Sequence, residues 1–328
     1  MTIPAPLAEL WRADLLESLH TGHVAICDEN GELIEAMGDA DALIYPRSAC
    51  KMVQALPLIE SGAADAHGLR SEHLALACAS HNGAAIHTDP VNAWLGDLGL
   101  GDDDFRCGPQ WPDDADANRH LIKTDNSPCQ VHNNCSGKHA GFLTLNRHLG
   151  GSADYVDPDH PVQIACRDAF ERATGMETPG FGIDGCSAPN FQTTVHGLAH
   201  AMARFASAPD DSAEARLRNA MMAHPELVAG EGRACTELMR AMNGKVAIKT
   251  GAEGVFIAII PEKRLGVALK VSDGATRASE CAIAAILVRL GVLDADHPAT
   301  RKRMNAPVLN RRGIAAAEIR PSAALVQG

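Results

Sequence analysis

A serine and a lysine early in the chain could together carry out nucleophilic catalysis. Ser48 and Lys51 lie three residues apart, just after Pro46. Residues 47–56 predict a helix that starts just after Pro46. Positions three apart on a helix share one face, so the hydroxyl and the amine can meet. A serine is a weak nucleophile until a nearby base takes its proton, and a lysine can be that base only while it is neutral. The spacing alone is a weak indication, because a capping serine and a solvated lysine produce it too.

Two later motifs strengthen this interpretation. Ser80–His81–Asn82 and Lys249–Thr250–Gly251 follow the first pair, in the order in which serine β-lactamases and penicillin-binding proteins carry Ser-x-x-Lys, Ser-Asp-Asn and Lys-Thr-Gly. Lys249 falls at a predicted strand, where a backbone N–H near Gly251 could stabilise an oxyanion. The middle motif departs from the pattern, because it follows the first more closely and carries His81 in place of aspartate. Together the motifs favour nucleophilic catalysis by serine.

A third group of residues is rich in thiols, amides and imidazoles. It comprises residues 132–139 and 184–186. Structural zinc sites normally have four cysteine or histidine ligands, and Cys135-x-x-Lys138 is not one of their usual spacings. From the residues alone we interpret this group as a Gly/Asn-rich loop with buried thiols and expect no metal there, although His132 and His139 are possible ligands.

Strand patterns occur near both ends of the chain and helical patterns between them. Residues 23–37 predict a β-hairpin with Asn30–Gly31 at its turn. Further strands are predicted over 245–248, 254–260, 265–271 and 312–319, and helices over 161–173, 198–206, 213–224 and 276–290. The simplest architecture is an α/β protein of the α+β type, with an antiparallel sheet from both termini flanked by helices and a mostly helical middle region. The predicted domains are residues 1–58 with 244–328, and residues 59–243.

Composition and charge exclude several classes of function. The chain has 328 residues and a formal net charge of −12 at pH 7, whereas nucleic-acid binding needs a basic face. No stretch approaches the roughly 18 apolar residues of a membrane span, so no membrane partner is expected. The first ten residues lack the basic start and apolar run of a signal peptide. The ten cysteines are therefore expected to be reduced thiols in a cytoplasmic protein.

Taken together, these motifs resemble those of the L-asparaginase II family, of the rhizobial type. Within them Cys-Ser-Gly-Lys-His is the most diagnostic piece, and the resemblance extends over nearly the whole chain. The matching stretches are residues 47–51, 78–81, 134–139, 184–186, 224–233 and 249–252.

The resemblance implies a serine β-lactamase-like fold, a homodimer, and hydrolysis of L-asparagine to L-aspartate and ammonia without an organic cofactor. Ser48 with Lys51, and Ser80 with Lys249, would form two catalytic tandems. Some members of the family hold a zinc ion that supports substrate binding rather than chemistry, and the matching ligands here are Cys135, Lys138 and Cys186.

Seven residues are expected to bind the substrate. Four of them are charged, which suits the carboxylate and the ammonium of an amino acid, and the others lie in the matching motifs. The set is Arg47, Asp184, Glu231 and Arg233 by charge, with His81, Asn134 and Gly251.

Two kinds of alternative stay open. A glutaminase or a β-lactam hydrolase on the same fold would use the same serines and lysines. A catalytically inactive protein that binds a metal or a metabolite would bind its ligand without releasing ammonia. Turnover of glutamine, asparagine and a chromogenic β-lactam separates these alternatives.

Overall fold

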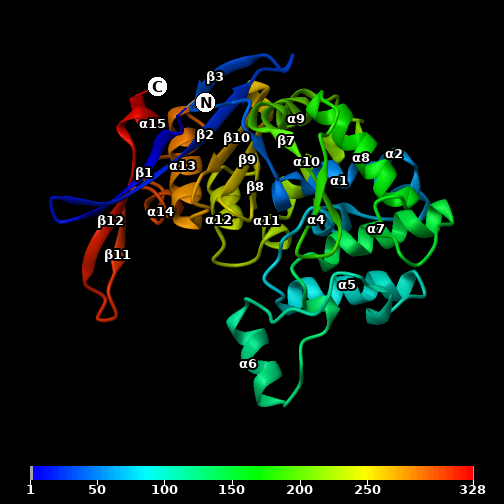
Figure 1. Ribbon diagram of the computed structural model, residues 1–328. Helices are drawn as coiled ribbons and strands as arrows, with labels where there is room; N and C mark the ends of the chain where they lie inside the picture. Colours follow the sequence, from blue (N-terminus) through cyan, green and yellow to red (C-terminus); the bar gives the residue numbers. More distant parts are fainter. Residues whose placement is uncertain (1–2, 328) are drawn as a thin grey trace. The chain divides into compact units, whose positions relative to one another are not determined.

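The computed structural model describes residues 3–327, and its largest feature is an eight-stranded antiparallel sheet (Figure 1). Strands from both ends of the chain form this sheet, as predicted. They are β1 (Ala5–Arg12), β2 (Leu15–Cys27), β3 (Leu33–Met37), β8 (Ala247–Gly251), β9 (Val255–Ile260), β10 (Leu265–Val271), β11 (Ala306–Leu309) and β12 (Ala315–Pro321). The order is β11-β12-β1-β2-β10-β9-β8, with β3 paired to β2.

The central strands of the sheet are buried on both faces. Every residue of β9 is buried, and β10 is nearly as enclosed, which is the pattern of strands covered by helices on both sides. Helix α9 (Val195–Ser207) packs on β10, β2 and β9, while α13 (Thr276–Arg289) packs on β1, β12, β9 and β10. The predicted fold class, a sheet from both termini flanked by helices, is confirmed.

The middle of the chain is mostly helical and is organised around α7 (Ser136–Leu149). The other helices of this region are α1 (Lys51–Gln54), α2 (Leu56–Glu60), α3 (Ala63–Ala66), α4 (Ser71–Ala77), α5 (Ala85–Asp97), α6 (Ala115–Lys123), α8 (Pro161–Thr174), α10 (Ala213–Ala223) and α11 (Pro225–Val228). Residues Ser136 to Asn146 of α7 are all buried, and α7 contacts α2, α3, α4, α5 and α8. The polar side chains at its start therefore need partners inside the protein.

The remaining elements are short. Two small ladders consist of β4 (Leu43–Ile44) with β7 (Thr193–Thr194), and of β5 (Phe181–Ile183) with β6 (Pro189–Phe191). The other helices are α12 (Ala234–Ala241), α14 (Pro298–Arg301) and α15 (Ala323–Gln327), with 3-10 turns η1 (Arg47–Cys50), η2 (Asp102–Asp104), η3 (Gln130–His132) and η4 (Pro261–Lys263). Within the described part of the chain, none of the helices has the length and apolar character needed to span a membrane.

The contacts within the chain divide it into two units. One comprises the chain up to Ala49, Thr193–Ser207 and everything from Glu237 onward, and it contains the large sheet. The other comprises Cys50–Gln192 and Ala208–Thr236, and it contains α7 and its neighbours. Helix α9 groups with the sheet, whereas the predicted division placed all of residues 59–243 in a helical domain. That division stays a prediction about domains.

The N-terminal strand β1 is an element that sequence reasoning missed. Its proline-rich start gave no strand pattern, yet β1 pairs with both β12 and β2. A register shift between Pro6 and Ala8 explains how the proline is accommodated, because proline lacks the N–H for a ladder bond and is tolerated at a bulge.

The helix predicted after Pro46 is broken into three short pieces. Residues Arg47–Cys50 form the 3-10 turn η1, and α1 and α2 follow it. Pro57 lies in the first turn of α2. Because proline has no N–H to donate to the preceding turn, it ends α1 and starts a new helix.

Packing of β10 against α9 leaves no room for a side chain at Gly266. A Cβ there would lie 2.1 Å from the nitrogen of Ala203 and 2.2 Å from the oxygen of Ala199. We expect Gly266→Ala to lower the free energy of unfolding by about 1–3 kcal/mol through overpacking. The control Gly96→Ala lies on an exposed part of α5 with no atom within 4 Å and should be stabilising by about 0.5–1 kcal/mol. Urea denaturation measures both, and a Gly266→Ala variant as stable as the wild type would contradict this packing.

Candidate active site

Ser48 lies in the turn η1, at the sequence position where a reactive serine is predicted. It is half-buried, and Arg47 before it has a φ of 52°. This left-handed conformation is strained for a residue other than glycine, and such strain concentrates at functional sites. The turn therefore combines a strained backbone at Arg47 with the predicted serine.

Strand β8 passes close to this turn within the sheet unit. A Cβ at Gly251 would lie 2.6 Å from the oxygen of Pro46 and 3.1 Å from the nitrogen of Ala49, so only glycine permits the approach. Lys249 on the same strand is fully buried, and its Nζ donates to the Thr250 oxygen at 2.8 Å. The Lys-Thr-Gly motif thus lies against the turn that carries Ser48.

Ser80 lies in the second unit, in an extended segment after α4 that is held from both sides. The N–H of Ser80 donates to the Val228 oxygen at 2.9 Å, and the N–H of His81 donates to the Asn134 oxygen at 3.1 Å. Ser80 is itself buried. These backbone bonds fix the segment between the start of α7 and the segment after α11.

Lys51 connects the Ser80 segment to the start of α7. Its side chain is 1% exposed, and its Nζ donates to the Ala79 oxygen and lies 3.1 Å from the Sγ of Cys135. The Sγ of Cys135 in turn lies 2.9 Å from Oδ1 of Asn134. The predicted base is therefore a buried amine with a carbonyl and a thiol as partners.

Lys138, in the first turn of α7, makes a second contact between a lysine and a cysteine. The Nζ of Lys138 is 3.0 Å from the Sγ of Cys186, which lies in the turn between β5 and β6. The three residues matched to a zinc site, Cys135, Lys138 and Cys186, all belong to this unit and are all buried.

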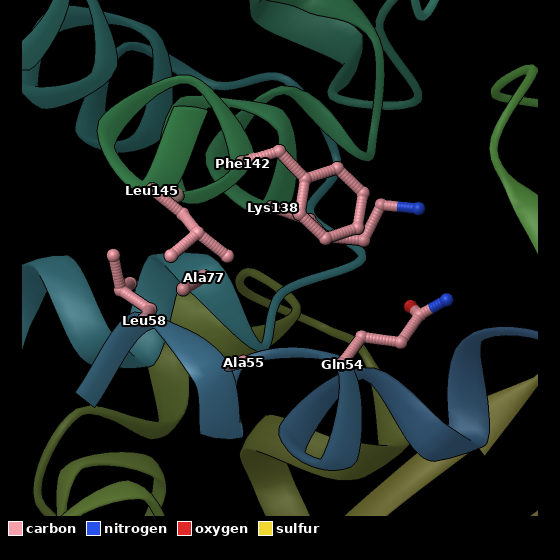
Figure 2. A pocket seen from close by; sticks show the side chains of 8 residues that line it. Gln54, Ala55, Leu58, Ala77, Lys138, Phe142 and Leu145 are labelled. Carbon is pink, nitrogen blue, oxygen red and sulfur yellow. The ribbon is translucent and has the colours of Figure 1, made fainter. Parts of the chain in front are cut away.

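The stem of Lys138 lies in apolar surroundings (Figure 2). Its Nζ is 5.0 Å from the centre of the Phe142 ring, and the two residues line a cavity of about 10 Å³, which is room for about one water molecule. Figure 2 shows the polar ends of Lys138 and Gln54 on one side of this cavity and the apolar side chains Leu58, Ala77 and Leu145 on the other. The Cys186 sulfur is therefore the important electrostatic partner of the amine.

The two cysteines differ in acidity. The hydrogen bond from Cys135 holds the pKa of Cys186 well below its ordinary value, and the Lys138 cation adds to this effect against the influence of burial. The same hydrogen bond and burial raise the pKa of Cys135 well above its ordinary value. Burial alone would lower the pKa of Lys138, but Cys186 and Cys135 raise it overall. The cluster is thus an ammonium–thiolate pair beside a neutral thiol.

Two neutral histidines border this cluster. Burial lowers the pKa of His139 to about 4 and that of His81 well below its ordinary value. The Nδ1 of His139 lies 2.9 Å from the Oη of Tyr155, which accepts a hydrogen bond from the N–H of Arg106 at 2.9 Å. Sequence reasoning missed Tyr155, because no motif surrounds it.

The zinc site is not tested by this structure. In the described part of the chain, no group of three or more His, Cys, Asp or Glu side chains is placed to hold a metal ion. Cys135, Lys138 and Cys186 do supply two sulfurs and a nitrogen, a donor set that suits zinc. A lysine ligand must be neutral, so zinc binding would have to displace the proton of Lys138. Zinc binding therefore stays a prediction, and the donor atoms of these three residues suit it.

The residues predicted to bind substrate are distributed over both units. Arg47 and Gly251 belong to the sheet unit with Ser48 and Lys249, and the other five belong to the unit of Lys51 and Ser80. Among these five, Glu231 is exposed, Asp184 is half-buried, and Arg233 lies 3.9 Å from Asp113. Their roles stay predictions.

The comparison with family models decides the assignment. Residues 8–321 match the family described as L-asparaginase II. The chain belongs to the L-asparaginase II family. The predicted resemblance to this family, whose name describes an amidohydrolase, is confirmed.

Solved structures similar to this L-asparaginase II family member are distant in sequence. Mglu in its native form is 14% identical with a TM-score of 0.45, over 84% of this chain and 66% of that chain, so this chain spans about two thirds of Mglu. A β-lactamase from Mycobacterium bovis is 13% identical with a TM-score of 0.47, over 81% and 94%. The D-alanine carboxypeptidase AmpC from Burkholderia cenocepacia is 11% identical with a TM-score of 0.37, over 79% and 90%. None of the curated proteins matches the chain.

The ammonium–thiolate pair predicts a pH-dependent contribution to stability. The pKa of Cys186 lies below the ordinary value of 9.0 in the folded chain. Between these two pKa values the unfolded chain binds a proton that the folded chain does not, so stability rises with pH. In metal-free protein, the difference in unfolding free energy between wild type and Cys186→Ala should therefore rise from about pH 6 to about pH 9, by up to about 1.4 kcal/mol per pH unit.

Cys281→Ala is the matched control for this experiment. Burial raises the pKa of the Cys281 thiol to about 12, so that thiol is protonated in both states below about pH 8. Its deletion should give the same loss of stability at every pH from about 6 to about 8. Parallel curves for wild type and Cys186→Ala would contradict a thiolate at Cys186.

Proposed function

We propose that this protein is an L-asparaginase, which hydrolyses L-asparagine to L-aspartate and ammonia with a serine nucleophile. The observation that carries the proposal is the match of residues 8–321 to the L-asparaginase II family. All four members of the two expected serine–lysine pairs are present in the chain, as Ser48, Lys51, Ser80 and Lys249. Lys51, Lys249 and the predicted zinc ligand Lys138 are all buried. Lysines are rarely buried, so their burial supports a functional role rather than that of solvated surface residues.

In the proposed reaction Ser48 Oγ attacks the side-chain amide carbon of L-asparagine while Lys51 accepts the hydroxyl proton. The Nζ of Lys51 contacts the Ala79 oxygen and the Cys135 sulfur. These partners hold the amine inside the protein, on a residue only three positions along the chain from Ser48. The lysine then returns the proton to the leaving ammonia, and water hydrolyses the aspartyl ester.

The oxyanion of this reaction would be stabilised by backbone donors. The N–H of Ser48 and those near Gly251 are the expected donors, and Gly251 lies against the turn of Ser48. Ser80 and Lys249 form the second proposed pair. The carboxylate and the ammonium of the substrate would be bound by charged residues among Arg47, Asp184, Glu231 and Arg233.

We further propose that Cys135, Lys138 and Cys186 hold zinc when the metal is supplied. The ion would support substrate binding through its positive charge rather than take part in bond cleavage. A homodimer and a cytoplasmic location also remain proposals that follow from the resemblance and the sequence.

Ammonia release by purified variants tests the proposed function. The wild type should release ammonia from L-asparagine, and Ser48→Ala and Lys51→Met should each lower kcat by a factor on the order of 10³ or more, because nucleophile and base act as a unit. Ser61→Ala removes an exposed serine hydroxyl at the end of α2 and should leave kcat unchanged.

The same assay distinguishes the alternatives. Faster release from L-glutamine than from L-asparagine would favour a glutaminase, and turnover of nitrocefin would favour a β-lactam hydrolase. A wild type that releases no ammonia from either amide, with zinc supplied, would overturn the proposal.

A further inference from the structure

His81 and Ser136 form a buried link between the Ser80 segment and the first turn of α7. The Nε2 of His81 lies 2.9 Å from the Oγ of Ser136. His81 is 1% exposed and Ser136 is fully buried. A hydrogen bond between side chains so far apart in sequence and so well shielded from water is a strong constraint on the two segments.

The partners of the His81 ring determine which way this bond runs. The N–H of Gly83 donates to Nδ1 of His81 at 3.2 Å, so Nδ1 carries no proton. The neutral ring therefore has its proton on Nε2 and donates it to the Ser136 oxygen. Two consequences follow: His81 cannot act as a base toward Ser136, and it has no free ring nitrogen for a substrate.

One face of the His81 ring is also occupied. The ring stacks on His87, with centres 4.8 Å apart and planes 8° from parallel. The Nε2 of His87 is in turn hydrogen-bonded to the Glu226 oxygen at 2.9 Å. Hydrogen bonds at both ring nitrogens and stacking on one face therefore fix the imidazole of His81.

The link joins two segments that carry reactive groups. Ser80 directly precedes His81, and Ser136 directly follows Cys135, whose sulfur contacts Lys51. The first turn of α7 is also pressed against the end of α4, because a Cβ at Gly137 would lie 2.4 Å from the Leu76 oxygen. The bond between His81 and Ser136 therefore adds a side-chain constraint on Ser80 to the backbone bonds of Ser80 and His81.

We propose that His81 is a positioning residue rather than a substrate ligand: through its hydrogen bond to Ser136 it holds Ser80 in place for amide hydrolysis. This inference rests on the proposed function. It predicts that loss of the bond lowers turnover and leaves substrate affinity nearly unchanged, because the bond orients a reacting group and contacts no substrate.

Two substitutions of His81 separate its two hydrogen bonds. In His81→Asn the amide oxygen can still accept from Gly83 but the side chain is too short to reach Ser136. In His81→Gln the longer side chain can donate to Ser136. We expect His81→Asn and Ser136→Ala to lower kcat for L-asparagine by about 10- to 100-fold with KM changed less than about twofold, and His81→Gln to keep most of the activity. His81→Asn combined with Ser136→Ala should lose little more than either alone.

Thr144→Val is the matched control. It removes a fully buried hydroxyl from α7 that bonds to Ala140 and Trp94, and it should leave kcat near that of the wild type. Thermal denaturation of each variant shows how much is folded at the assay temperature.

Three results would overturn the positioning role while the wild type still hydrolyses L-asparagine. The first is unchanged kcat in both His81→Asn and Ser136→Ala. The second is a raised KM with unchanged kcat in His81→Asn, which would indicate that His81 binds the substrate. The third is an equal loss of kcat in Thr144→Val, which would show that the losses in the other variants come from general destabilisation. A wild type without activity would instead overturn the proposed function.

Discussion

Lysine amines in the protein interior set the main constraint on this structure. Lys51, Lys138 and Lys249 are each at most 2% exposed, and an isolated ammonium at such depth would be very unfavourable. Each therefore has a polar partner: Cys135 for Lys51, Cys186 for Lys138 and the Thr250 carbonyl for Lys249. The helix start, the turn between β5 and β6, and strand β8 are the elements that bring these partners to the amines.

Helix α7 shows how the fold serves this constraint. Its buried body supplies apolar contacts to five neighbouring helices, while its start concentrates Cys135, Ser136, Lys138 and His139. Gly137 allows close packing on the end of α4, so the Ser80 segment lies beside these polar groups. Buried polar groups at the start of a central helix need partners, and Asn134, His81 and Cys186 supply them for Cys135, Ser136 and Lys138.

The sequence predicted the sheet and the reactive residues better than it predicted their surroundings. Alternating and continuous apolar runs indicated β9, β10 and α13, because burial dictates such patterns. The strand β1 was missed because Pro6 conceals it, and the helix after Pro46 was predicted too long because Pro57 interrupts it. Contacts between distant segments, such as His81 with Ser136 or His139 with Tyr155, have no local signal and follow only from the tertiary structure.

In the proposed mechanism a serine of this chain becomes acylated by the substrate. Rapid acid quenching of the enzyme during turnover of L-asparagine, followed by proteolysis and mass spectrometry of the peptides, would detect the acylated serine. We expect an aspartyl ester on Ser48, absent in Ser48→Ala. An ester on Ser80 would keep the chemistry and exchange the roles of the two serines. Active turnover with no acylated serine at any quench time would contradict covalent catalysis by serine.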